Sequence, residues 1–221
     1  MKLWLNALIK YLLGLILVGA LVFCPAGSLR FPNGWLFMGL LFGPMLLLGI
    51  VLLFKSPTLL EKRLNNKEKR SAQKGVTSVA ALLFVAGFIV AGLDHHYGWS
   101  TVPLWAVITA SAVLVTAYGL YAEVMRENAY LSRTIEVQEG QRVVDSGLYG
   151  IVRHPMYAVT LWLFLSIPVV LGSWWALLCF APYIPVIVAR ILDEEKLLER
   201  ALDGYAEYKG RVKYRLIPFI W

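Results

Sequence analysis

Long apolar stretches constrain this chain more than any other feature of its sequence. Six of them contain roughly 20 mostly apolar residues each, the length that a helix needs to cross about 30 Å of hydrocarbon. We predict spans at residues 3–23, 35–54, 76–93, 102–122, 156–172 and 176–191. Only helices and closed barrels satisfy backbone hydrogen bonds inside a bilayer, so the sequence predicts an all-α integral membrane protein with about six transmembrane helices.

The composition excludes a soluble globular domain, because 59% of the residues are hydrophobic and only 16% are charged. The last two spans together are too long for one helix, and residues 172–175 predict a tight turn between them. Pro168, Pro182 and Pro185 are expected to bend the two helices of this hairpin.

The 21 Lys and Arg residues fall almost entirely on one side of the predicted spans. If the N-terminus is cytoplasmic, nineteen of them lie in cytoplasmic segments, including seven between Lys55 and Lys74 and seven from Arg190 to Arg215. Basic residues concentrate on the cytoplasmic side of membrane proteins, so both termini are predicted to be cytoplasmic. The formal net charge of +7 therefore indicates orientation in a membrane rather than nucleic-acid binding.

Three smaller features receive non-catalytic interpretations. The basic loop at 55–75 is expected to orient the chain and to face lipid headgroups. Lys10, inside the first span, is expected to reach the interface by snorkelling. Asp94, His95 and His96 are expected to form a solvated turn, because adjacent histidines point in different directions and no third metal ligand is evident. The two cysteines have no metal-ligand spacing, so no metal site is predicted.

The first concentration of polar residues beside the spans runs over residues 123–157, of which 123–128 are expected only to extend the preceding helix. Turn-forming residues surround the short apolar pair Val143-Val144, so the backbone there is expected to be irregular and to offer N–H and C=O groups to a ligand. Arg153 and His154 then precede a proline that suits the first turn of a helix. These two residues either anchor the helix at the lipid headgroups or belong to a site, and local chemistry leaves both interpretations open.

The second concentration of polar residues begins where the last span ends. Arg190 and Glu194 are four residues apart and therefore share one face of a helix. Strong charge beside hydrocarbon is costly unless it faces protein, water or a ligand, which makes this pair a candidate site. Glu195 lies on a neighbouring face and is expected to pair with Lys196 or Arg200 of the tail.

Several motifs follow one another in the C-terminal half of the chain. They are Gly147-Leu-Tyr-Gly-Ile-Val-Arg-His-Pro-Met-Tyr157, the apolar hairpin after it, Arg190 with Asp193-Glu-Glu195, and Gly204-Tyr-Ala-Glu-Tyr-Lys209. Together, in this order and spacing, they resemble the isoprenylcysteine carboxyl methyltransferase family and its relatives, the phospholipid methyltransferases. The resemblance covers roughly residues 120–221, whereas the first four spans match only as hydrophobic segments.

The resemblance implies methyl transfer from S-adenosylmethionine at the cytoplasmic membrane face, in a pocket built by the loop before Arg153 and by the acidic pair of the last helix. The implied cofactor-binding residues are Gln141, Arg142, Val143, Val144, Tyr149, His154, Pro155, Met156, Tyr157 and Glu194. Arg190 is implied to bind the methyl acceptor, so Arg190 and Glu194 are the candidate catalytic residues. Many family members have His where this chain has Gln141, but Gln also supplies a donor and an acceptor.

The family resemblance also suggests a division of the chain. Residues 1–122 are expected to form four N-terminal spans with the basic cytoplasmic loop at 55–75. Residues 123–221 are expected to form the catalytic region, with the cofactor loop, the helical hairpin and a C-terminal tail. Apolar and charged residues recur at helical spacing from 197 to 208, which predicts an interfacial amphipathic helix along the bilayer.

The methyl group of a sulfonium is already activated, so such a protein mainly has to align an acceptor and exclude water, without a metal or a covalent nucleophile. The leading expectation is O-methylation of a carboxylate in an isoprenylcysteine-like acceptor, which Arg190 would hold through two parallel hydrogen bonds. The expected partners are a lipophilic small molecule or lipidated substrate and the lipid bilayer, and not nucleic acid. Three alternatives stay open: a phospholipid or other lipid N-methyltransferase, an NADPH-dependent enzyme similar to sterol reductases, and a non-catalytic membrane protein that retains the motifs.

Overall fold

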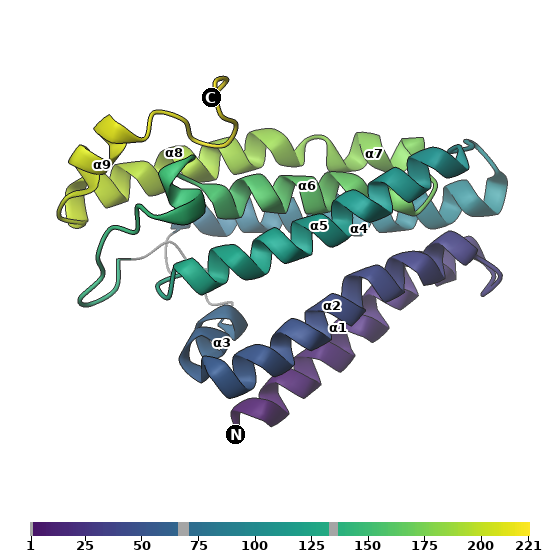
Figure 1. The fold of residues 1–221 in the computed structure, drawn as a ribbon. Helices are drawn as coiled ribbons and strands as arrows, with labels where there is room; N and C mark the ends of the chain where they lie inside the picture. Colours follow the sequence, from purple (N-terminus) through teal and green to yellow (C-terminus); the bar gives the residue numbers. More distant parts are fainter. Residues whose placement is uncertain (1, 66–70, 133–136) are drawn as a thin grey trace.

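The computed structural model describes residues 2–65, 71–132 and 137–221, and no strand occurs within them. The elements in chain order are α1 (Leu3–Ala26), α2 (Pro32–Lys55), α3 (Pro57–Leu64), α4 (Ser71–Tyr97), α5 (Leu104–Glu127), the 3-10 helix η1 (Gly147–Gly150), α6 (Pro155–Val170), α7 (Trp174–Phe180), α8 (Tyr183–Ala201) and α9 (Tyr205–Arg211). Helices α4 to α8 form one bundle, and the pair α1–α2 runs obliquely beneath it (Figure 1). The predicted all-α membrane fold is confirmed.

The membrane-spanning segments are apolar helices, as predicted, but fewer of them than the predicted six are long enough to span a bilayer. Within the described residues, five segments are long and apolar enough to cross a bilayer: Leu3–Ala26, Pro32–Lys55, Gly75–Tyr97, Leu104–Glu127 and Trp174–Ala201. The predicted fifth span is α6, whose 16 residues extend only about 24 Å at 1.5 Å per residue. Ser166, Ile167 and Val170 of this helix are buried in the bundle. The helix therefore packs largely against protein, although it is shorter than the other spans.

The predicted hairpin between the last two apolar segments is present, and its second arm contains a break. Gly172 adopts a positive φ of 78° in the turn after α6, and the Ser173 hydroxyl accepts a hydrogen bond from the Ala176 N–H at the start of α7. Pro182 is the N-cap of α8 and separates it from α7. Pro185 lies in the first turn of α8, where a missing N–H removes no helical hydrogen bond, so the bend falls before α8 rather than within it.

Aromatic rings fill the interior where α4 meets α7. The Phe180 ring is buried, and its centroid lies 5.2 Å from that of Phe84 and 5.7 Å from that of Phe88. Gly87 makes this approach possible, because a Cβ atom there would lie 2.2 Å from Cε2 of Phe180. Aromatic side chains are therefore closely packed in this part of the bundle.

Asp94 ties together two loops at one end of the bundle. Its carboxylate accepts hydrogen bonds from the Ser100 N–H at 2.7 Å, the Ser100 hydroxyl at 2.6 Å and the Ser173 hydroxyl at 2.5 Å. His96 Nδ1 lies 3.1 Å from the Ala26 carbonyl oxygen. The expected solvated turn is therefore wrong for Asp94, which is only 2% exposed and joins the ends of α4 and α7.

The basic loop at 55–75 contains the short helix α3, and residues 66–70 of this loop lie outside the described residues. Leu59 and Leu60 are buried against Leu52 and Met125, so α3 folds back onto the bundle. Lys10 donates a hydrogen bond to the last carbonyl of α3, which the snorkelling prediction did not foresee. The α3 part of the loop, Pro57–Leu64, therefore packs on the bundle and is more than a basic surface facing lipid.

The structure divides the predicted amphipathic tail into two helices. Helix α8 continues ten residues beyond the predicted end of its span at residue 191, and α9 follows a turn in which Gly204 has a φ of 81°. The buried residues Leu202, Tyr205 and Tyr208 pack with Val143 of the predicted cofactor loop. The apolar face of the tail is thus covered by protein.

Candidate active site

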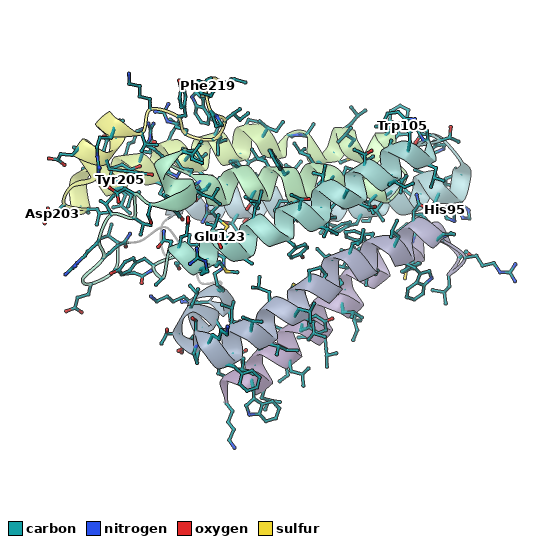
Figure 2. The ribbon with its side chains drawn as sticks, in the orientation of Figure 1. His95, Trp105, Glu123, Asp203, Tyr205 and Phe219 are labelled. Carbon is teal, nitrogen blue, oxygen red and sulfur yellow. The ribbon has the colours of Figure 1, made fainter. Side chains whose placement is uncertain are left out.

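The main cavity lies at the end of the bundle marked by Tyr205 in Figure 2, opposite the end marked by His95 and Trp105. Its volume of about 570 Å³ is typical of small-molecule sites. The predicted site residues that line it are Gln141, Arg142, Val143, Val144, Tyr149, His154, Met156, Tyr157, Arg190 and Glu194. Of the predicted set, only Pro155 is absent from the lining. It is buried as the first residue of α6, where it starts the helix rather than contacting the cavity.

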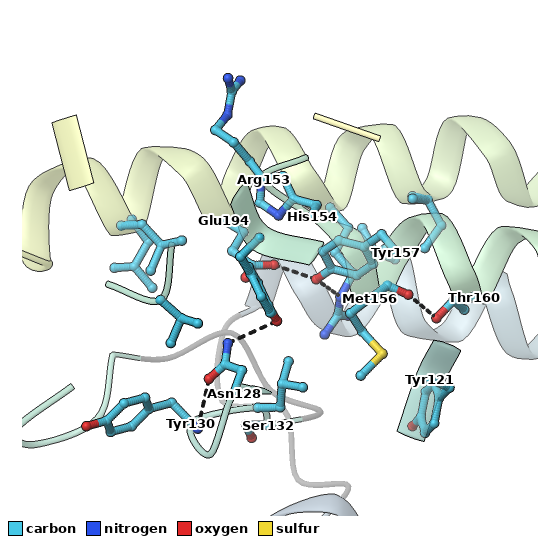
Figure 3. A pocket seen from close by; sticks show the side chains of 18 of the residues that line it. Tyr121, Asn128, Tyr130, Ser132, Arg153, His154, Met156, Tyr157, Thr160 and Glu194 are labelled. Carbon is cyan, nitrogen blue, oxygen red and sulfur yellow. Dashed lines mark hydrogen bonds between the residues drawn. The ribbon is translucent and has the colours of Figure 1, made fainter. Parts of the chain in front are cut away.

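Three predicted residues meet at the centre of the cavity. The Tyr157 hydroxyl donates a hydrogen bond to Glu194 Oε2 at 2.5 Å (Figure 3). It accepts one from Arg190 Nε at 3.0 Å. Arg190 and Glu194 are one helical turn apart on α8, and Tyr157 lies in the first turn of α6. The arrangement places a cation and an anion of fixed orientation beside the same hydroxyl, at the junction of the polar and apolar parts of the cavity.

Arg153 and His154 are not headgroup anchors, because they are only 6% and 5% exposed. Arg153 Nε lies 2.7 Å and His154 Nε2 lies 3.2 Å from the same oxygen of Glu195. Arg215 binds the other oxygen of Glu195 at 2.9 Å. The expected pairing of Glu195 with Lys196 or Arg200 is therefore wrong.

The same network fastens the C-terminal segment to the start of α6. Arg153 donates side-chain hydrogen bonds to the carbonyls of Val212 and Lys213 at 2.7 and 2.8 Å. The backbone N–H groups of Arg153 and His154 donate to two further carbonyls of this segment at 2.8 and 2.9 Å. A buried carboxylate with several charged donors is costly to disturb, so Glu195 holds the wall of the cavity in place.

Tyr149 is held by residues that were expected only to extend α5. Asn128 donates a hydrogen bond to the Tyr149 hydroxyl at 3.0 Å. Glu127 accepts one from the Leu148 N–H at 3.0 Å and fills the space beside Gly147, where a Cβ atom would lie 1.4 Å from its carboxylate. Burial raises the pKa of the Tyr149 phenol well above its usual range, so the hydroxyl stays protonated.

The described part of the predicted cofactor loop, which excludes residues 133–136, closes on itself through Gln141. The Gln141 side-chain oxygen accepts a hydrogen bond from the Gln138 N–H at 2.9 Å, and the Gln141 N–H donates to the Gln138 carbonyl at 3.0 Å. Gly140 between them has a φ of 68°. The side-chain oxygen of Gln141 is therefore used within the turn, whereas its amide N–H groups can donate to a ligand.

Two basic residues of α3, which the sequence placed at the lipid surface, contact this loop. Lys62 donates a hydrogen bond to the Gln138 side chain at 2.5 Å. Arg63 donates to the Ser132 carbonyl at 3.3 Å and to the Tyr121 hydroxyl, and it lines the cavity. The sequence signal for these contacts was the presence of basic residues in a short helix that begins with proline. That signal does not predict that α3 folds onto α5, which is what brings the two side chains to the cavity.

Tyr205 has a buried hydroxyl at the wall of the cavity, without a hydrogen-bond partner in the part of the chain that the structure describes. Its side chain lines the cavity and is 4% exposed, yet no described residue forms a hydrogen bond with its hydroxyl. Burial, and then the carboxylates of Glu195 and Glu194, raise its pKa well above the usual range, so the hydroxyl remains a donor. Buried polar groups normally have partners, so this hydroxyl fits a hydrogen-bond acceptor on a bound molecule. The tyrosine rings and the Glu194 carboxylate suit a ligand with a planar ring and a positive charge.

Known proteins resemble the chain in both sequence and fold. The phospholipid methyltransferase family model matches residues 104–203. The Delta(14)-sterol reductase TM7SF2 of Mus musculus is 31% identical over 99 residues, which cover 40% of this chain and 22% of the reductase. The solved structure of the eukaryotic intramembrane Ras methyltransferase ICMT, isoprenylcysteine carboxyl methyltransferase, matches with a TM-score of 0.57 at 18% identity. That match covers 97% of this chain and 77% of the other.

These comparisons confirm the resemblance predicted from the motifs. The segment matched by the family model contains α5, η1, α6, α7 and α8, and residues 104–203, with their loops, supply most of the cavity lining. The chain spans about a fifth of the length of the curated reductase that it matches. The likeness to the solved methyltransferase concerns the fold and extends over nearly the whole chain.

Proposed function

We propose that this chain, whose residues 104–203 match the phospholipid methyltransferase family, is an S-adenosylmethionine-dependent methyltransferase that acts on a lipophilic acceptor. The observation that carries the proposal is the contact of Arg190, Tyr157 and Glu194 in one cavity, between a polar end and an apolar end. We further propose that this cavity opens to the cytoplasm and that both termini are cytoplasmic, as the distribution of basic residues predicts.

The polar end of the cavity suits the cofactor. When bound, S-adenosylmethionine supplies a methyl group that its sulfonium has already activated. Glu194 opposes positive charge there, and Tyr205 donates a hydrogen bond to a polar group of the ligand. Tyr149, fixed by Asn128, offers a ring face at the same end. The remaining predicted contacts, from Arg142, Val143, Val144 and Met156, surround this space.

The acceptor is proposed to be a carboxylate, as in an isoprenylcysteine-like substrate. Arg190 lines the cavity, and its Nε donates to the Tyr157 hydroxyl. A planar guanidinium suits a carboxylate, which matches its fork geometry. Arg190 would orient the carboxylate toward the methyl group that the bound cofactor supplies, and a carboxylate acceptor has no proton to lose. The protein therefore contributes alignment and exclusion of water. The alternative is phospholipid N-methylation, in which a neutral amine would take the place of the carboxylate.

A sterol-reductase-like function is the second candidate, because the mouse reductase shares 31% identity over 99 residues. The two functions differ in the soluble ligand that should bind. Protein in lipid nanodiscs should be stabilised against heat by S-adenosylhomocysteine, since a ligand at about 100 times its Kd adds roughly 2.7 kcal/mol to the unfolding free energy. Stabilisation by NADPH without stabilisation by S-adenosylhomocysteine would favour the reductase. Stabilisation by neither would favour a non-catalytic protein.

A further inference from the structure

The apolar part of the cavity, called the arm below, is lined by one stripe of residues from each of three helices. The stripes recur every three or four residues, as expected for one face of a helix. The lining residues are Val76, Thr77, Ala80, Ala81 and Phe84 of α4, Met156, Tyr157, Thr160 and Phe164 of α6, and Tyr183, Val186, Ile187 and Arg190 of α8. Thr160 donates its hydroxyl to the Met156 carbonyl at 2.7 Å, so it adds no free donor to the arm.

All three stripes end at one aromatic cluster. The ring centroids of Phe84, Phe164 and Tyr183 are separated by 4.5, 5.2 and 5.2 Å, so the three side chains touch across the arm. The layer beneath them is filled by Phe180 and Phe88, and Phe88 does not line the cavity. The cluster of Phe84, Phe164 and Tyr183 is therefore a closed floor.

Three helices give the same depth for the arm. At 1.5 Å per residue, each stripe rises about 10–12 Å along its helix. The stripes run from Val76 to Phe84 on α4, from Tyr157 to Phe164 on α6, and from Arg190 to Tyr183 on α8. A saturated chain with bonds near 1.5 Å and angles near 111° advances about 1.25 Å per atom. The arm therefore holds roughly eight to ten chain atoms.

We propose that the aromatic floor of Phe84, Phe164 and Tyr183 sets an upper limit on the length of the acceptor, at about eight to ten chain atoms beyond its carboxylate. The inference rests on the proposed function, because the carboxylate must sit at Arg190, and it restricts an isoprenylcysteine-like acceptor to chains of about five to seven atoms after the sulfur. A longer chain pushes the carboxylate away from the methyl donor, and a displacement of about 1 Å can cost on the order of a hundredfold in rate.

The test uses N-acetyl-S-alkylcysteines with propyl, pentyl, heptyl, nonyl and pentadecyl groups, presented with the full chain in nanodiscs. Cα, Cβ and sulfur contribute three chain atoms, so pentyl and heptyl probes fill the arm. Methyl transfer should fall at least about tenfold from heptyl to nonyl and pentadecyl. Phe84→Ala should extend the limit by about four atoms, the reach of the lost ring, and restore the nonyl probe.

Matched variants keep the test decisive if Phe84→Ala unfolds. Phe84→Leu should extend the limit by a smaller amount. Ala80→Leu fills the arm one turn above the floor, so it should reject the heptyl probe while keeping the propyl probe. Phe88→Leu removes a similar ring from the layer beneath the floor and should leave the length limit unchanged.

Two readouts separate this proposal from the proposed function. Probe binding is measured by thermal stabilisation in the presence of S-adenosylhomocysteine, and methyl transfer is measured separately. A binding optimum at pentyl to heptyl without any methyl transfer would keep the length limit and remove the reaction. Equal methyl transfer to heptyl and pentadecyl probes would keep the reaction and overturn the limit, because the chain would then leave sideways past the exposed Thr77 and Ala81.

Discussion

Glu194 and Glu195 are consecutive residues of α8 with opposite surroundings. Glu194 lines the cavity and accepts a hydrogen bond from the Tyr157 hydroxyl. Glu195 is 3% exposed and binds Arg153, His154 and Arg215. Successive residues of a helix are rotated by about 100°, so one acidic pair can serve two sides of the same helix.

The difference assigns different tasks to the two carboxylates. The Glu195 network is closed within the protein and joins α6, α8 and the C-terminal segment. Glu194 keeps the capacity to interact with a ligand, because it faces the cavity next to Arg190 and Tyr157. Replacing Glu195 should therefore change the stability of the fold, whereas replacing Glu194 should change ligand binding.

The largest effect is expected for Glu195→Ala. Removing one member of a buried charge network leaves Arg153 and His154 without their carboxylate, which costs about 3–5 kcal/mol of unfolding free energy. Chemical unfolding in detergent without any ligand measures this loss. Glu199→Ala is the matched control, because Glu199 pairs with Lys209 at the partly exposed surface and should contribute at most about 1 kcal/mol. Equal losses in both variants would contradict the assignment.

Glu194→Gln should weaken ligand binding and leave the stability of the fold nearly unchanged, the opposite of the result expected for Glu195→Ala. Loss of a charged partner is worth about 1.5–3 kcal/mol, so the affinity for S-adenosylhomocysteine should fall roughly 10- to 100-fold. The unfolding free energy without ligand should change by less than about 1 kcal/mol, because Gln can still accept from Tyr157. Isothermal titration measures the first quantity. An unchanged affinity would remove Glu194 from the cofactor site.

Arg190→Lys should affect the acceptor and leave the cofactor alone. Lysine keeps the charge but loses the planar fork that holds a carboxylate and the Nε contact to Tyr157. We expect kcat/KM for the acceptor to fall roughly tenfold or more, with the affinity for S-adenosylhomocysteine within about twofold of the original. Steady-state kinetics with a varied acceptor concentration tests this. Equal activity of the variant would point to another anchor.

The smallest effect is expected for Tyr205→Phe, which removes only the unpartnered hydroxyl. The affinity for S-adenosylhomocysteine should fall about 3- to 10-fold, the value of one neutral hydrogen bond. The stability without ligand should stay the same or rise, because the variant no longer buries an unsatisfied polar group. A loss of stability with unchanged affinity would mean that the hydroxyl serves the fold.

The parts of the molecule predicted from sequence are those that depend on local spacing. The apolar segments follow from length, and the approach of Arg190 to Glu194 follows from the helical period. The placement of Tyr157 beside them depended on the family resemblance, and the structure brings the three together.

The missed parts depend on contacts between distant segments. Glu195 binds residues that are 42, 41 and 20 positions away, so local pairing with Lys196 or Arg200 was the wrong expectation. Arg63 reaches the cavity only because α3 folds back onto α5. Tyr205 was assigned to an amphipathic face, since periodicity detects an apolar ring and does not reveal an unpartnered hydroxyl.

The proposed methyl transfer is tested most directly with methyl-labelled S-adenosylmethionine and N-acetyl-S-pentylcysteine in nanodiscs. The wild-type chain should produce label that mild base releases as methanol, the behaviour of a methyl ester, and Glu194→Gln should lose most of it. The matched Glu199→Gln variant should retain it. Absence of label with the wild type, or label that resists base and resides in lipid headgroups, would contradict carboxylate methylation.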